Sequence, residues 1–238
     1  MPFDLILVMP VYNESECIAR VISSWSDMLA SLHIRYRLIV LNDGSRDDTA
    51  ARLESFRTDE NIEIIHKENA GHGPTILLGY RRAVQLSEWV FQTDSDDEIS
   101  PIHFQSFWKN RDGYDAIFGV RQHRSRSIAR RAISQAARLA VRVLYSGGIH
   151  DVNVPYRLIR AAALKQLIAS LPPDTFAPNV IVSGAIARSG LRFLEIPIPC
   201  EGRRTGTVSI ARWGLWKAVA RSLVQTISCR QLVARGGR

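Results

Sequence analysis

The sequence predicts an α/β protein with a mostly parallel central sheet flanked by helices. Short apolar runs alternate with segments of helical periodicity through the first half of the chain, as they do in consecutive βα units. Clusters of polar residues directly follow three of these apolar runs. The chain has 238 residues, of which 46% are hydrophobic and 23% charged, and this composition suits one globular domain with a small appendage.

The expected strands are short runs of apolar residues. The first, "FDLILVMPVY" at residues 3–12, is apolar almost throughout, which is typical of a strand buried on both faces of a parallel sheet. Further strands are expected at residues 36–43, 62–67, 88–94, 114–121 and 191–200.

The expected helices repeat their apolar residues at helical spacing. In residues 15–32 the repeat consists of Ile18, Val21, Ile22, Trp25 and Leu29. Further helices are expected at residues 47–56, 73–86, 127–145, 160–170, 177–189 and 212–230. Two of them, 127–145 and 212–230, are amphipathic, with arginines opposite the apolar face in the first and tryptophans within it in the second.

The charge of the chain is unevenly divided between its halves. Residues 1–118 hold 11 Lys and Arg against 19 Asp and Glu, a formal charge of −8. Residues 119–238 hold the other 20 basic and 4 acidic residues, a formal charge of +16. Such asymmetry indicates two different partners, the basic half meeting something anionic such as a membrane surface or a nucleic acid.

The cysteines and the apolar segments bear on the cellular compartment. Cys17, Cys200 and Cys229 are far apart and odd in number, which favours a reducing environment. The first residues lack the basic leader of a signal peptide, and no stretch reaches the ~20 unbroken apolar residues of a membrane span. We therefore expect a cytoplasmic protein, at most peripheral at the inner face of a membrane.

The segment "TDSDDE" at residues 93–98 places four acids in six residues at the end of an expected strand. Asp94 and Asp96 are two residues apart, so that a turn can aim both carboxylates at one divalent cation. Hard oxygen ligands of this kind suit Mg²⁺ or Mn²⁺, which also bind substrate phosphates. The alternative is a solvated acidic turn, and this motif alone does not exclude it.

Three further motifs accompany the acidic one. They are "PVYNE" at residues 10–14, "LNDGSRDDT" at 41–49 and "NAGHGPTILLGY" at 69–80. With these four motifs in this order and spacing, the chain resembles the family 2 glycosyltransferases across residues 4–120. The resemblance implies the GT-A fold, which binds a nucleotide sugar, and an inverting, metal-dependent transfer of a hexose.

The resemblance also implies roles for particular residues. Asp94 and Asp96 would hold the metal ion on the diphosphate, with Glu98 as a third oxygen ligand, and Asp96 and Arg121 would act in catalysis. The residues implied to bind the nucleotide are Pro10, Tyr12, Glu14, Asn42, Asp43 and Asp94.

The basic half resembles one branch of the family, the polyprenyl-phosphate sugar synthases typified by dolichyl-phosphate mannose synthase. The resemblance is carried by "GVRQHRSRSIARRAIS" at 119–134, "DVNVPYRLIR" at 151–160 and "GRRTGTVS" at 202–209. It implies that the phosphate of a lipid acceptor is bound by Arg121, Arg130, Ser134 and Arg203. Arginine suits this role because its planar fork donates paired hydrogen bonds to phosphate oxygens.

The acceptor decides whether a general base is needed. A phosphate monoester is already anionic at neutral pH, whereas a hydroxyl must lose its proton to a base. Asp151 is the candidate base if the acceptor is a hydroxyl, and its alternative role is to cap a turn or to pair with Arg157. The competing function is therefore a family 2 enzyme acting on a hydroxyl of a soluble or cell-envelope glycan.

Two other classes of protein are disfavoured. A nucleic-acid-binding module would use the arginine-rich helix, but that helix follows an acidic half and no recognised nucleic-acid motif is present. A nicotinamide dehydrogenase would show G-x-G-x-x-G after the first strand, and the chain does not. The base and the sugar of the donor stay open between guanosine diphosphate mannose and uridine diphosphate sugars.

We expect one GT-A domain at residues 1–210, with a donor half at 1–118 and an acceptor half at 119–210. Residues 211–238 would form an amphipathic helix and a basic tail. Aromatic and aliphatic side chains on one arc of that helix, with basic residues at its margins, are typical of an interfacial membrane helix, although a helix packed on the core has the same pattern.

Overall fold

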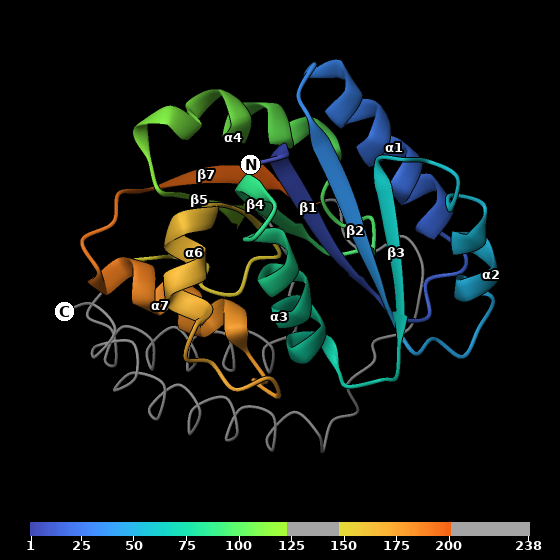
Figure 1. The fold of residues 1–238 in the computed structure, drawn as a ribbon. Helices are drawn as coiled ribbons and strands as arrows, with labels where there is room; N and C mark the ends of the chain where they lie inside the picture. The colour runs from blue at the N-terminus through green and yellow to red at the C-terminus, as the bar shows by residue number, and fades with distance from the viewer. Residues whose placement is uncertain (123–147, 201–238) are drawn as a thin grey trace.

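The computed structural model describes residues 1–122 and 148–200. Within these residues one sheet of seven strands has the order β3-β2-β1-β4-β6-β5-β7 (Figure 1). The strands are β1 (Phe3–Val11), β2 (Tyr36–Asp43), β3 (Ile62–Lys67), β4 (Ser87–Thr93), β5 (Ala116–Gln122), β6 (Tyr156–Arg160) and β7 (Phe193–Pro199).

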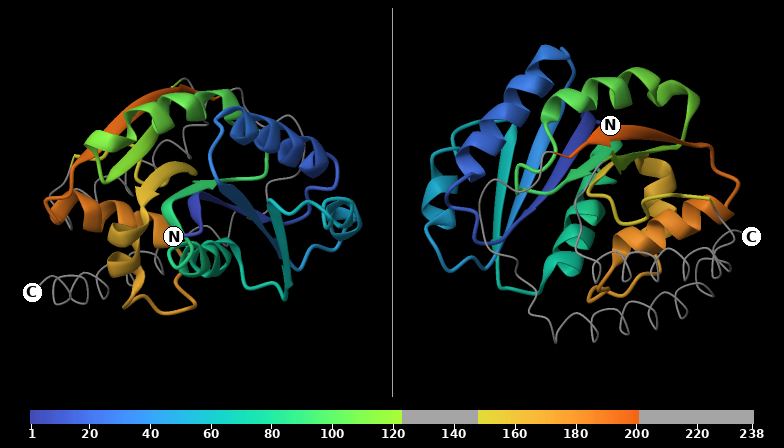
Figure 2. Two further views of the ribbon diagram at one scale, coloured as in Figure 1. Left: turned by 45° about the horizontal axis from the view of Figure 1, so that its top comes forward. Right: turned by 180° about the vertical axis from the view of Figure 1, so that it is seen from behind.

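Helices cover both faces of the sheet (Figure 2). They are α1 (Ile18–Ser31), α2 (Thr49–Glu54), α3 (His72–Ala83), α4 (Phe104–Asn110), α6 (Ala161–Ile168) and α7 (Pro178–Arg188), with 3₁₀ turns η1 (Pro101–His103) and η2 (Arg111–Gly113). The helices α3, α6 and α7 pack together on one face, and α1 and α4 lie on the other. Among the described residues, no helix is both long and apolar enough to cross a membrane.

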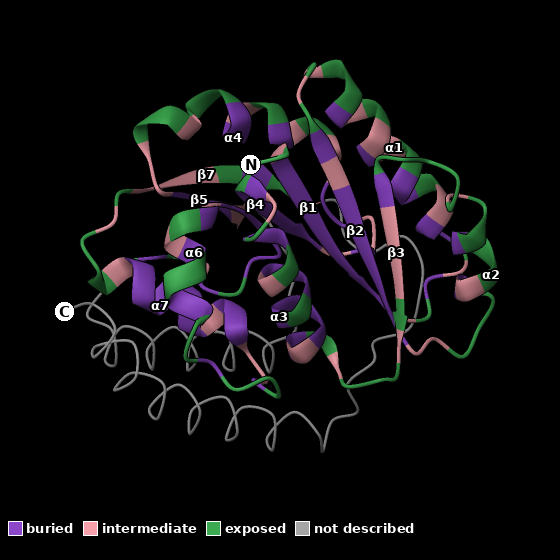
Figure 3. Ribbon diagram, viewed as in Figure 1, coloured by how far each residue is buried: buried purple, intermediate pink, exposed green. Residues whose placement is uncertain are grey.

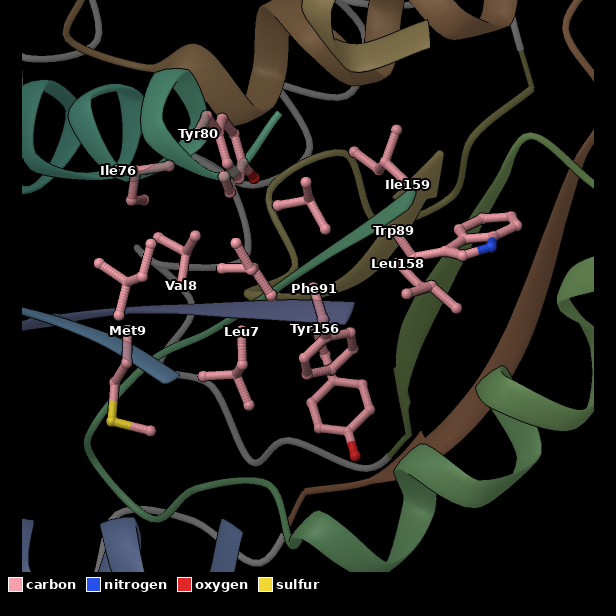
Figure 4. Close-up of a cluster of buried hydrophobic side chains, with 14 of the residues drawn as sticks. Leu7, Val8, Met9, Ile76, Tyr80, Trp89, Phe91, Tyr156, Leu158 and Ile159 are labelled. Carbon is pink, nitrogen blue, oxygen red and sulfur yellow. The ribbon is translucent and has the colours of Figure 1, made fainter. Parts of the chain in front are cut away.

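Strand β1, in the interior of the sheet, is buried on both faces from Leu5 onward, as its run of apolar residues predicts (Figure 3). Val8 points toward Ile76 and Tyr80 of α3, whereas Leu7 points to the opposite face, where Phe91 and Tyr156 lie (Figure 4). On that second face, the ring of Phe91 lies 4.8 Å from that of Tyr156, centroid to centroid. The core is therefore continuous through the sheet.

The direction of the strands brings their carboxyl ends to one edge of the sheet. Pairings of β1 with β2 and β4, of β2 with β3, and of β5 with β7 are parallel. Only β6 among the described strands runs antiparallel to its neighbours, β4 and β5. Two reversals restore the original direction, so β5 ends at the same edge as β1, β2 and β4. In parallel sheets this edge is where ligands bind.

The expected mostly parallel sheet is confirmed, and each expected strand lies within two residues of its predicted ends. Strand β6 and helix α4 were not expected. The β6 segment "YRLIR" has a buried arginine at its second position, so it does not form the continuous apolar run by which a buried strand is recognised in a sequence. Helix α4 has only seven residues, too few to display a helical repeat. The predicted helices at 127–145 and 212–230 lie outside the described residues.

Candidate active site

The loops that follow β1 and β2 are held together by hydrogen bonds in both directions. The backbone N–H of Asn13 donates to Ser45 Oγ at 3.0 Å, and that of Arg46 donates to Asn13 Oδ1 at 2.8 Å. The backbone N–H of Glu14 donates to Thr49 Oγ1 at 2.9 Å. These bonds fix two of the sequence motifs against one another at the carboxyl ends of adjacent strands.

The three residues predicted from the first motif differ in exposure. Pro10 is buried within β1, and Glu14 is buried beyond its end, with Cys17 Sγ 3.4 Å from its Oε2. Tyr12 is half-buried and keeps more surface open to a ligand than the other two.

Asp43 anchors the segment that leads into α3. Its carboxylate accepts hydrogen bonds from the Lys67 ammonium and from the backbone N–H groups of Ala70 and Gly71, at 2.8 and 2.9 Å. Burial alone would raise the pKa of Asp43, but these donors outweigh it and hold the pKa below its usual value. The carboxylate is thus ionised and fixed in orientation.

Asn42 joins β2 to β3 through its side chain. Its Nδ2 lies 3.0 Å from Nδ1 of His66, and its Oδ1 accepts from the backbone N–H of Ser45 at 3.1 Å. Both Asn42 and Asp43 are buried and have partners within the protein. A direct contact of either residue with a nucleotide stays a prediction.

Asp94 is the first acid after β4, and 27% of its side chain is exposed. Gln92 Nε2 donates to Asp94 Oδ1 at 3.1 Å, and His72 Nε2 lies 3.6 Å from the same oxygen. Burial, reinforced by the negative charges of Asp96 and Glu98, raises the pKa of Asp94 to about 6 despite the opposing effect of His72. Negative charge is therefore concentrated at this point.

A tight turn arranges the remaining acids. Asp96 Oδ1 accepts from the backbone N–H of Glu98 at 3.2 Å, and Glu98 is buried. Asp97, with a φ of 56°, forms an ion pair with Arg20 of α1 at 2.9 Å. The turn thus directs Asp97 to α1, whereas Asp96 and Glu98 remain in electrostatic contact with Asp94.

The acids suit a divalent cation that is only partly coordinated by protein. No three His, Cys, Asp or Glu side chains of residues 1–122 and 148–200 converge as a ready metal site. A cation held by Asp94 and Asp96 would take its other oxygen ligands from a diphosphate and water, as Mg²⁺ and Mn²⁺ commonly do. The two carboxylates lie within electrostatic range of one another at the carboxyl end of β4, and their hard oxygen atoms fit such an ion.

Arg121, at the end of β5, forms an ion pair with Asp151. Its Nε and Nη2 lie 2.7 and 3.0 Å from the two carboxylate oxygens, and the side chains are 11% and 19% exposed. Burial lowers the pKa of Arg121, but the hydrogen bonds and the negative charge of Asp151 raise it by more. The net effect is a raised pKa. The pairing of Asp151 with Arg157 that we considered from the sequence is wrong, because Arg157 donates to Val152, Val154 and Asn179 instead.

Arg121 lies within electrostatic range of the acids. Its charge lowers the pKa of Asp94, and the charge of Glu98 contributes to the raised pKa of Arg121. The remaining residues predicted to bind the acceptor phosphate, Arg130, Ser134 and Arg203, lie outside the described residues. Of the predicted acceptor residues, Arg121 therefore lies at the same edge of the sheet as the predicted metal ligands and within electrostatic range of them.

Three residues near the site were not predicted from the sequence as site residues: Lys67, His72 and Gln92. Lys67 ends β3, and a polar residue at the end of a parallel strand is a signal that could have identified it. Gln92 is a buried amide within the otherwise apolar run "WVFQ", and a polar residue there requires a partner. His72 begins α3 within a glycine-rich loop.

An open pocket of about 550 Å³ lies between α1 and the η1 region. Its walls include Arg20, Asp27, Asp97 and Ile102, and none of the predicted site residues lines it. The predicted site residues that the structure describes lie instead at the carboxyl ends of the strands.

The sequence matches Glycosyl transferase family 2 over residues 6–168. The chain is a family 2 glycosyltransferase. Two proteins named undecaprenyl-phosphate 4-deoxy-4-formamido-L-arabinose transferase are similar to this chain. That of Pseudomonas paraeruginosa (strain DSM 24068 / PA7) is 27% identical over 192 residues, covering 79% of this chain and 56% of the relative. That of Klebsiella pneumoniae (strain 342) is 25% identical over 204 residues, covering 84% and 60%. This glycosyltransferase chain thus spans less than two thirds of the length of these relatives.

Solved structures confirm the GT-A fold expected for this glycosyltransferase. Glucosyl-3-phosphoglycerate synthase from Mycobacterium tuberculosis, in complex with Mn²⁺, uridine-diphosphate-glucose and phosphoglyceric acid, superposes with a TM-score of 0.71. The identity is 17%, and the match covers 96% of this chain and 80% of the synthase. The complex of that synthase with phosphoglyceric acid gives a TM-score of 0.70 at 18% identity. At such identity the likeness establishes the fold.

Proposed function

We propose that this glycosyltransferase moves a sugar from a nucleotide-sugar donor to a polyprenyl phosphate, with inversion at the anomeric carbon. The single observation that carries the proposal is the position of Arg121, near the end of β5, at the same carboxyl edge of the sheet as the acids that follow β4 and within electrostatic range of Asp94. The acids can bind a donor diphosphate through a cation, and the largely buried Arg121 can bind an acceptor phosphate directly.

On the donor side, Asp94 and Asp96 would hold Mg²⁺ or Mn²⁺ against the diphosphate. When bound, the ion supplies Lewis-acid stabilisation of the leaving nucleoside diphosphate. The interlocked loops after β1 and β2 would position the nucleoside, with Tyr12 open to the base or ribose. The Mn²⁺ and uridine-diphosphate-glucose bound in the similarly folded synthase support this arrangement.

On the acceptor side, Arg121 would bind the phosphate with the N–H groups that its pair with Asp151 leaves free. The two bonds to Asp151 use Nε and one N–H of Nη2, and a guanidinium has five N–H donors. An oxygen of the lipid phosphate forms the new bond to the anomeric carbon, and the bond to the diphosphate oxygen breaks. The leaving nucleoside diphosphate takes the electron pair, and no proton needs to be removed from the acceptor.

The names of the relatives support a lipid phosphate as acceptor, since both specify undecaprenyl phosphate. The competing acceptor is a hydroxyl, which would need a general base. Asp151 was the candidate base, and its two carboxylate oxygens accept bonds from Arg121. A carboxylate that is paired with an arginine is a weaker proton acceptor. This favours a phosphate over a hydroxyl as the acceptor of the sugar.

The test is transfer of labelled sugar into an organic phase. The protein is incubated with Mn²⁺, undecaprenyl phosphate and, in parallel, guanosine diphosphate mannose and several uridine diphosphate sugars. We expect one donor to label the lipid fraction and Arg121→Gln to reduce labelling by about 100-fold, as when a charge-stabilising donor is removed.

Arg35→Gln is the matched control for this test. Arg35 makes a similar pair with Asp4, through Nη2 at 2.6 Å and Nε at 3.4 Å, but at the amino end of β1. The Arg35→Gln variant should transfer sugar at the rate of the unaltered protein. Labelling of a water-soluble glycan instead of the lipid, with Arg121→Gln fully active, would favour the hydroxyl acceptor and reject the proposal.

A further inference from the structure

A buried polar residue interrupts the apolar strand β4 two positions before Asp94. Gln92 is fully buried, and it faces the side of the sheet covered by α3 and α7, since it pairs with Val8 in β1. Residues two apart in a strand point to the same face. The amide of Gln92 and the carboxylate of Asp94 therefore share one face, and Nε2 donates to Oδ1 at 3.1 Å.

The hydrogen bond to Asp94 is the last of three in series. Tyr80 of α3 donates its hydroxyl proton to Asn179 Oδ1 at 2.9 Å, and Asn179 Nδ2 of α7 donates to Gln92 Oε1 at 3.0 Å. All three donors point the same way, toward Asp94. Hydrogen bonds in series polarise one another, and in a low-dielectric interior they strengthen cooperatively.

The orientation of each amide follows from its partners. An ionised carboxylate can only accept hydrogen bonds, so Gln92 must direct its NH₂ group toward Asp94. Its carbonyl oxygen then faces Asn179. Asn179 is also held by its backbone, since its carbonyl oxygen accepts from Arg157 Nη1 at 3.0 Å. Arg157 is the neighbour of Gln92 across the antiparallel pairing of β4 and β6. The series is thus tied to α3, α7 and two strands.

We propose that Gln92, Asn179 and Tyr80 are positioning residues that hold the Asp94 carboxylate in the rotation needed to bind the divalent cation. The inference rests on the proposed function for the identity of the cation site. Gln92 donates to Oδ1, the oxygen that also faces His72, so that Oδ2 would be available to the cation. Ligating carboxylates are commonly oriented by such outer hydrogen bonds, and removing the partner weakens metal binding about 10- to 100-fold.

The experiment measures Mn²⁺ binding directly, by electron paramagnetic resonance of free Mn²⁺ during titration in the presence of uridine or guanosine diphosphate. We expect Gln92→Leu to weaken Mn²⁺ binding by about tenfold. Asn179→Leu should weaken it less, and Tyr80→Phe least, because each step is farther from the carboxylate. Tyr80→Phe keeps its ring in the core, so it tests the inference even if a leucine variant fails to fold.

Two controls separate positioning from loss of stability. Ser87→Ala removes a buried hydroxyl at the opposite end of the same strand β4, where it donates to Trp89 O at 2.9 Å. Tyr36→Phe removes the hydroxyl of a tyrosine at the amino end of β2, which donates to Ser26 O at 3.4 Å. Both should bind Mn²⁺ as the unaltered protein does, even where the temperature of thermal unfolding shifts by a few degrees.

The results discriminate this inference from the proposed function. Unchanged Mn²⁺ binding in folded Gln92→Leu and Tyr80→Phe would overturn the inference, as would equal weakening in Ser87→Ala. If the unaltered protein binds Mn²⁺ with nucleotide but labels no lipid, the acceptor assignment fails and this inference stands. In the transfer assay, the Mn²⁺ concentration for half-maximal rate should rise in Gln92→Leu while KM for the lipid is unchanged.

Discussion

Arg121 and Asp151 come from separate parts of the chain and form a nearly buried, two-bond ion pair, Nε to Oδ2 at 2.7 Å and Nη2 to Oδ1 at 3.0 Å. Arg121 is the last residue but one of β5, and Asp151 lies in the segment that leads into β6. Such a pair fixes the plane of the guanidinium and thus the direction of its remaining N–H groups.

Asp151→Asn tests whether this residue positions Arg121 or acts as a base. If it positions Arg121, KM for the lipid phosphate should rise about tenfold because the guanidinium is less well oriented, whereas KM for the donor should be unchanged. A general base removed from a hydroxyl acceptor would instead lower kcat by about 10²- to 10⁴-fold. Steady-state kinetics with each substrate varied in turn distinguish the two results.

Asp43→Asn should destabilise the protein in a pH-dependent way. The pKa of Asp43 is lower in the folded protein than its usual value of 3.8, so its contribution is present above that value and is lost as the pH falls through the folded pKa. We expect the variant to be about 2 kcal/mol less stable at pH 7, as for loss of hydrogen bonds to a charged group. Urea unfolding at pH 7 and below pH 4 should show this difference shrink in acid, and a constant difference would contradict the prediction.

Arg157→Met should be strongly destabilising. The guanidinium is fully buried and donates to the carbonyl oxygens of Val152, Val154 and Asn179 and to Ser183 Oγ. Methionine fills part of the volume but makes none of these hydrogen bonds, at a cost of about 3 kcal/mol or more in the free energy of unfolding.

Arg160→Met is the control for that change. Arg160 stacks on Trp89 at 4.4 Å from the ring centroid but is 39% exposed, so its loss should cost about 1 kcal/mol or less. Equal unfolding midpoints of the two variants in urea would argue against the role of Arg157.

Gly73→Ala should disturb the start of α3. A Cβ at this position would lie 2.1 Å from the backbone oxygen of Phe176, so that the loop before α7 must move. We expect a loss of about 1–3 kcal/mol, as for overpacking elsewhere. Gly113→Ala is the matched control, because a Cβ there meets nothing within 4 Å, and thermal unfolding should separate the two variants.

Sequence patterns predicted most of the sheet because burial on both faces leaves a local mark. The run in β1 reads as a strand, and the polar clusters after β1, β2 and β4 could be assigned to one edge because parallel strands share a direction. The acids at Asp94 and Asp96 were found in the same way, since a dense acidic turn is visible in a few consecutive residues.

The amino-acid sequence by itself determined the strands, the edge at which polar residues collect and the family to which the chain belongs. Only the tertiary structure decided that the antiparallel strand β6 lies between β4 and β5, and hence that Arg121 pairs with Asp151 and that Gln92 meets Asn179. The physical reason is that the periodicity of a sequence depends on which residues are buried. Which residues contact one another depends on the order of the strands in the sheet. Contacts between residues distant in the chain leave no local pattern in the sequence.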